Sequence, residues 1–170
     1  MLRAEKLPYQ PSDEQLQNIG RLLAFQIFMG GEDMLPAPGV ARSNTGNVIV
    51  STESGAVSMI DVTGGGSYKN RTVHPKVRAG VKALVRPGSG GPLTEEVRRM
   101  LAHWTGTGHD VGKAGRKEMR EGFKRSMRDI VEFDLEELRA DWQEVFPEYE
   151  YKDAMAFMRK TQKLFQTMLG

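Results

Sequence analysis

With 170 residues and a formal net charge of +2, the chain is long enough for one domain with a sizeable hydrophobic core, expected over 1–170. It contains no cysteine, which excludes disulfides, thiolate chemistry and cysteine-ligated zinc. No run approaches the roughly 18 apolar residues of a membrane helix, and the first residues lack the apolar segment of a secretory signal, so we expect a protein made in the cytoplasm that has no membrane partner.

A helix is predicted over residues 13–29. Ser12 and Gln15 have the spacing of a capping box, in which each side chain bonds the backbone N–H of the other residue. Gly30 and Gly31 follow the last apolar residue, and glycine readily adopts the left-handed conformation that ends a helix. The apolar residues between these signals recur at helical spacing: Leu16, Ile19, Leu22, Leu23 and Ile27.

The next predicted element is a β-hairpin within a glycine-rich excursion at 38–75. Two short β-branched segments, 47–52 and 56–62, flank a turn. A hairpin of two strands is marginal in water by itself, and its apolar residues alternate imperfectly, so both faces carry some. We therefore expect it to project and dock on a partner. The expected docking residues are Val48, Val50, Val57, Met59 and Ile60. The alternative is that the hairpin lies on its own helices and completes the core.

The rest of the chain is predicted to be mostly helical. Residues 77–85 fit a short helix, with a strand as the alternative, and Thr94 has the place of an N-cap for a helix that carries Val97, Met100, Leu101 and Trp104. Three more helices follow, which begin after Asp110, after Asp134 and at about Asp153. Their expected inward residues are Met119, Phe123, Met127, Ile130 and Val131, then Leu135, Leu138, Trp142 and Phe146, then Ala154, Phe157, Met158, Thr161, Leu164, Phe165, Met168 and Leu169. The predicted fold is mainly α with a small hairpin (α+β), a bundle of four to five helices.

The segment GTGHDVGKAG (106–115) resembles a phosphate-binding loop only superficially. Thr107 stands where a Walker A motif has its first glycine, and Lys113 is followed by Ala114 instead of serine or threonine. We interpret the segment as a glycine hinge between two helices, with Asp110 as the cap.

Other catalytic and metal-binding patterns are weak. His103, His109 and Asp110 flank a glycine break and lack the i, i+4 spacing of helical zinc ligands. No nucleophile lies in a recognisable motif, and the carboxylates near residue 134 stand at a helix start, where the helix dipole favours them. We therefore expect no metal, no cofactor and no enzymatic activity.

The charge is strongly polarised along the chain. Residues 68–128 hold 15 Lys/Arg and 5 Asp/Glu, whereas residues 129–153 hold 2 Lys/Arg and 10 Asp/Glu. The basic block includes one helical face whose members step by three or four: Lys113, Arg116, Lys117, Arg120, Lys124 and Arg128. The acidic block supplies the opposite surface: Glu132, Asp134, Glu136, Glu137, Asp141 and Glu144. Opposite blocks of this kind can pair with each other within the chain, pair between subunits, or offer the basic block to a polyanion.

Two functional hypotheses remain. The first is a non-catalytic structural subunit that assembles with copies of itself or with other subunits of a larger particle; neck, connector and capsid-associated proteins of viruses and phages commonly have this build, which would place the protein in a virion. The alternative is a nucleic-acid-binding, nucleocapsid-like protein that uses the basic face, although only Phe123 among the nearby residues offers a ring for stacking on bases.

Overall fold

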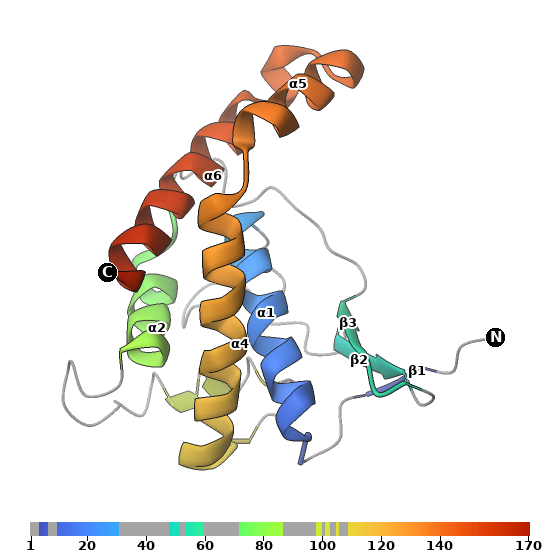
Figure 1. Cartoon of the computed structure of the whole chain (residues 1–170), viewed down its shortest axis with the longest axis vertical. Coiled ribbons are helices and arrows are strands. Elements are labelled where there is room, and N and C mark those ends of the chain that lie inside the picture. The colour runs from blue at the N-terminus through green and yellow to red at the C-terminus, as the bar shows by residue number, and fades with distance from the viewer. Residues whose placement is uncertain are drawn as a thin grey trace.

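A computed structural model describes residues 4–6, 10–30, 48–51, 54–59, 72–86, 98–99, 101–102, 105 and 109–170. Within these ranges five helices and one antiparallel sheet form a mainly helical α+β fold, as the sequence predicted (Figure 1). Most of the glycine-rich excursion at 38–75 lies outside the described residues. None of the described helices is long and apolar enough to cross a membrane.

Helix α1 (Asp13–Phe28) begins and ends where the sequence indicated. The Ser12 N–H donates to Gln15 Oε1 at 2.9 Å, and the Gln15 N–H donates to Ser12 Oγ at 3.2 Å, which completes the capping box. At the other end Gly30 has a φ of 64°, the left-handed conformation that stops a helix. Four of the five residues of the predicted apolar stripe are buried, with Leu16, Ile19, Leu23 and Ile27 at most 3% exposed, and Leu22 is half-buried.

Helix α4 (Gly112–Glu132) lies parallel to α1 and in direct backbone contact with it (Figure 1). A Cβ placed on Gly20 would lie 2.0 Å from the carbonyl oxygen of Met119, and one placed on Gly122 would lie 1.8 Å from the carbonyl oxygen of Gln17. Only glycine lets the two backbones approach this closely. We call this pair of positions the glycine contact. The side chain of Gln17 also crosses it, donating from Nε2 to Glu118 Oε2 at 2.8 Å.

Two further helices cover α4 and complete the core. Helix α6 (Glu148–Leu169) packs on α4 and α1, and its Phe165 ring meets Phe123 edge to face with centroids 6.0 Å apart. Helix α2 (Pro75–Val85) packs on α4 and α6, so the helical reading of 77–85 is correct and the strand alternative is wrong. The expected inward residues of α4 and α6 are buried, except that Val131, Met168 and Leu169 are half-buried.

The start of α6 differs from the sequence prediction. The helix begins at Glu148, five residues before the expected Asp153, because Pro147 already stands at its N-cap in an extended conformation. The additional turn buries Tyr151, whose ring meets Trp142 edge to face at 6.2 Å between centroids. The extra helical residues are therefore held by packing that an acidic, polar sequence does not reveal.

Helix α5 (Leu135–Val145) extends from the helical core. Asp134 caps it as predicted, accepting from the N–H groups of Glu136 at 2.8 Å and Glu137 at 3.3 Å. Its tertiary packing is mainly on α6, and Leu135 is its one buried residue. Phe146, expected to face inward, is 46% exposed because no other described element covers that end. We call residues 134–152 the helical arm; it forms the upper end of the molecule in Figure 1.

The sheet has three strands where the sequence indicated two. Strands β2 (Val48–Ser51) and β3 (Val57–Met59) form the predicted antiparallel hairpin, with Val50 opposite Val57. Strand β1 (Ala4–Lys6), which was not predicted, adds to the free edge of β2. β3 contacts α1, so the sheet rests on the helical core.

The helix expected after Thr94 lies mostly outside the described residues. Residues 98–99 and 101–102 are helical and Leu101 is buried, whereas Thr94, Val97, Met100 and Trp104 belong to the undescribed part.

The glycine contact predicts that glycine-to-alanine substitutions at these positions destabilise the fold, the opposite of their ordinary effect on the free energy of unfolding. In a helix interior this change ordinarily stabilises by about 0.5–1 kcal/mol. We expect Gly20→Ala and Gly122→Ala each to lower the free energy of unfolding instead, by about 1–3 kcal/mol, because the methyl group would push the two backbones apart. Urea unfolding measures this.

The control for that measurement is Lys117→Ala, at a side chain on α4 that is 68% exposed. It should change stability by no more than about 0.5 kcal/mol. Stabilisation by either glycine substitution would show that the backbones do not touch.

Candidate interaction surfaces

The six basic residues predicted on one helical face all lie on α4, but they do not form one continuous free surface. Arg116 is bound to Asp110, with Nη1 at 2.5 and 2.7 Å from the two carboxylate oxygens. Arg120 donates from Nε to the carbonyl oxygen of Leu84 at 2.7 Å and so binds the C-terminal turn of α2 to α4. Two of the six cations are therefore engaged by groups of the same molecule.

The remaining four divide into two groups along α4. Lys113 and Lys117 are exposed near its first turns, and Lys117 Nζ lies 3.8 Å from Glu118. Lys124 and Arg128 lie further along and line a groove with Arg86.

This groove lies between the ends of α2 and α6 and has a volume of about 240 Å³. Its apolar lining comes from Val85, Met168 and Leu169, and its basic lining from Arg86, Lys124 and Arg128. Arg86 shapes it by donating to the carbonyl oxygens of Thr167 at 3.0 Å and Met168 at 3.2 Å. We call it the basic groove. Sequence reasoning missed it, because Arg86 is remote from the α4 stripe along the chain.

All six residues of the predicted acidic surface are exposed, and all belong to the helical arm or to the end of α4. Glu136 has partners within the molecule: it is paired with Arg139 at 3.5 Å and, more closely, with Arg159 of α6. Asp134 serves as the cap of α5. Of the other four, Glu137, Asp141 and Glu144 extend the negative charge along the arm, and Glu132 lies at the end of α4.

Exposed apolar residues gather at the end of the helical arm, among these carboxylates. Val145 is 71% exposed, Phe146 46% and Tyr149 80%, and Glu144 and Glu148 are exposed beside them. We call residues 144–149 the arm tip. The sequence pattern did not single out Val145 or Tyr149, since each lies two residues from Pro147, where two helical periodicities meet. In the sequence, the one indication that they are exposed is that neither falls on the apolar face of its helix.

Two of the five predicted docking residues of the hairpin are described with their side chains, and both are buried. Val50 and Val57 are 8% and 9% exposed and belong to the core cluster that includes α1. These two residues follow the alternative, in which the hairpin lies on its own helices. Val48 and Met59 are paired across the strands, their side chains are outside the described part, and Ile60 is outside it altogether. A docking role for the hairpin stays a prediction.

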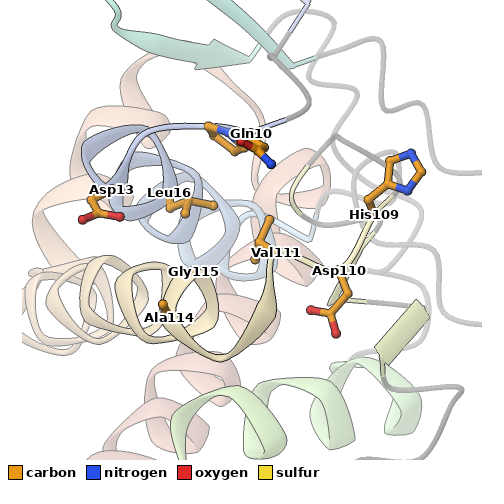
Figure 2. Close-up of a pocket in the computed structure, with 9 residues that line it drawn as sticks. Gln10, Asp13, Leu16, His109, Asp110, Val111, Ala114 and Gly115 are labelled. Atoms are coloured by element: carbon orange, nitrogen blue, oxygen red, sulfur yellow. The ribbon is translucent and has the colours of Figure 1, made fainter.

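A cleft of about 360 Å³ separates the chain before α1 from the first turn of α4 (Figure 2). It contains part of the glycine-rich segment at 106–115. Asp110 accepts from the Gly112 N–H at 3.0 Å and Val111 occupies the N-cap position, so Asp110 stabilises the turn before the helix instead of capping it. Figure 2 shows the side chains of His109 and Asp110 pointing to different sides.

The polar groups of this cleft do not converge on a common point, and the Asp110 carboxylate is already occupied by Arg116. Among the described residues no three His, Asp or Glu side chains are placed to hold a metal ion, and His103 lies outside them.

No protein-family model matches the chain, and no curated protein sequence matches it either. Among the described surfaces, the arm tip and the basic groove are the most distinctive.

The bond from Arg120 to Leu84 predicts which cations of the stripe are structural. Arg120→Met keeps the apolar stem but leaves a helix-end carbonyl without its donor, so we expect the free energy of unfolding to fall by about 1–3 kcal/mol. Lys117→Met, at an exposed position, should change it by no more than about 0.5 kcal/mol. Equal effects of the two substitutions in thermal or urea unfolding would contradict this assignment.

Proposed function

We propose that the protein is a non-catalytic structural subunit that assembles with copies of itself, and with other subunits of a larger particle, through complementary acidic and basic surfaces. The observation that carries the proposal is the arm tip, where exposed apolar side chains lie among carboxylates at the far end of a projecting helix pair. Exposed apolar groups gathered at one place mark a partner surface more often than isolated ones do.

The packing of the helical arm supports this proposal. Among the described elements α5 packs mainly on α6, and Leu135 is the one residue of α5 that is buried. Of the 19 residues of the arm (134–152), only Leu135 and Tyr151 are buried. A partner that covers Val145, Phe146 and Tyr149 would supply the burial that the isolated chain lacks.

The kind of particle is proposed by analogy of build. Small helical subunits with a projecting element are typical of neck, connector and capsid-associated components of viruses and phages, and we propose a virion component of this kind. The protein would then be synthesised in the cytoplasm and incorporated into the virion.

The alternative function is nucleic-acid binding by the basic face of α4. The exposed Lys113, Lys117 and Arg128 favour it, since each cation that neutralises a phosphate releases a counterion. However, Arg116 and Arg120 are engaged within the molecule, and Phe123, the one aromatic residue considered for stacking, is completely buried. The assembly proposal is therefore the stronger of the two.

The proposal predicts self-association that weakens with salt. The Debye length falls from about 30 Å at about 0.01 M salt to about 3 Å at about 1 M, so pairing of the acidic and basic surfaces should loosen over this range. Each exposed ion pair contributes only about 0–1 kcal/mol, so a visible effect requires several pairs together with apolar contact. Light scattering coupled to size-exclusion chromatography measures the mass.

We expect a mass above that of the 19.0 kDa monomer at low salt and high protein concentration, decreasing as salt is added. A monomer at near-millimolar concentration in low salt would contradict self-assembly. The 260 to 280 nm absorbance ratio of the purified protein tests the alternative, because bound nucleic acid would raise it.

A further inference from the structure

We propose that the arm tip of one copy docks in the basic groove of the next copy. The inference rests on the proposed function and specifies its contact: a negatively charged, apolar projection of one subunit enters a positively charged, apolar recess of another.

The arm tip has the chemistry of an anchor. Tyr149 and Val145 are among its most exposed side chains, at 80% and 71%, and a tyrosine supplies a large apolar area at little cost in side-chain entropy. Glu144 and Glu148 flank them and are exposed. No described cation is paired with either carboxylate, in contrast to Glu136, which pairs with Arg159.

The basic groove has the complementary chemistry. Its apolar lining, made by Val85, Met168 and Leu169, receives apolar atoms, and its volume of about 240 Å³ is of the size of one large side chain. Lys124 and Arg128 lie beside this lining, from α4. These two cations attract a carboxylate of the arm tip and repel other cations. The charge of the groove therefore favours binding of the arm tip over binding of a basic segment.

The two surfaces belong to opposite ends of the same helix. The arm tip includes the first residues of α6 and the basic groove includes its last, separated by about 30 Å at 1.5 Å per residue. In Figure 1 the arm is at the upper end and the C-terminal end of α6 lies beside α2. Because a rigid helix holds the surfaces apart, the tip cannot fill the groove of its own molecule.

A contact between two different surfaces of identical subunits is heterologous. Such contacts repeat from copy to copy and give a closed ring, or a filament when the rotation does not close. A second copy is therefore the occupant that the charges and positions favour, and a ring or filament is the expected product.

Charge reversal with rescue tests the contact. The tip variant carries Glu144→Lys and Glu148→Lys, and the groove variant carries Lys124→Glu and Arg128→Glu. The control matched to the tip variant carries Glu14→Lys and Glu121→Lys, which reverse one exposed carboxylate in the first turn of α1 and one within α4, with the same change in net charge as the tip variant. Sedimentation velocity of the full chain gives the apparent dissociation constant, and circular dichroism checks the fold.

Like charges placed together at an interface cost several kcal/mol, so each variant alone should associate about 100-fold more weakly than the unaltered chain. An equimolar mixture of the two should associate to within about tenfold of it, because every tip then finds a groove of opposite charge. The control should match the unaltered chain. If a charge variant does not fold, Tyr149→Ser, at an exposed position, should still weaken association by about tenfold or more.

The outcomes separate this inference from the proposed function. Assembly of the unaltered chain that persists in both charge variants would overturn the docking contact and leave assembly through another surface. Weakening without rescue in the mixture would also overturn it, since the tip and groove would then contact other sites. An unaltered chain that stays monomeric would overturn both.

Discussion

The backbone contact between α1 and α4 is the constraint on which the rest of the fold depends. At Gly20 and Gly122 the main chains of the two helices meet with no space for a side chain, which fixes their separation and alignment. Because the helices are parallel, the chain must travel the full length of the pair between them, over residues 29–111. The hairpin and α2 lie within that connection. The close pair also leaves a continuous apolar face from Phe123 to Ile130 on which α6 packs.

The position of the helical arm follows from this core. Where α4 ends, Gln162 of α6 donates from Nε2 to the carbonyl oxygens of Ile130 and Phe133, each at 2.8 Å, and so satisfies a helix end that has no further turn. The Phe133 ring meets Phe28 edge to face at 6.2 Å between centroids. These contacts fix the direction of the chain at the end of α4. As a result, α5 extends away from the helical core, and α6 runs back along α4. The arm is thereby held at its base while its tip stays uncovered.

The sequence predicted the elements that depend on residues near one another along the chain. It missed the features that depend on contacts between residues far apart along the chain. Caps at Ser12 and Asp134 and the apolar stripes located most helices, since these signals act within a few residues. Strand β1 was missed because Ala4–Lys6 has no β-branched residue and is a strand only by pairing with β2. The role of Gly122 was equally hidden, because a glycine in a helix ordinarily indicates weakness. The basic face was predicted as a face, but the partner of Arg120 lies 36 residues away, and periodicity does not reveal it.

The central claim is that the glycine contact holds the helical core together and that the helical arm, attached at its base, docks on another copy. Hydrogen exchange followed by mass spectrometry, over a dilution series, tests this claim. Local openings reveal which segments are held by the core. We expect the amides of α1 and α4 around Gly20 and Gly122 to exchange most slowly at every concentration. The arm tip should exchange fast in the dilute monomer and slow down on assembly. A tip already protected in a verified monomer, or α1 and α4 exchanging before the arm, would contradict this account.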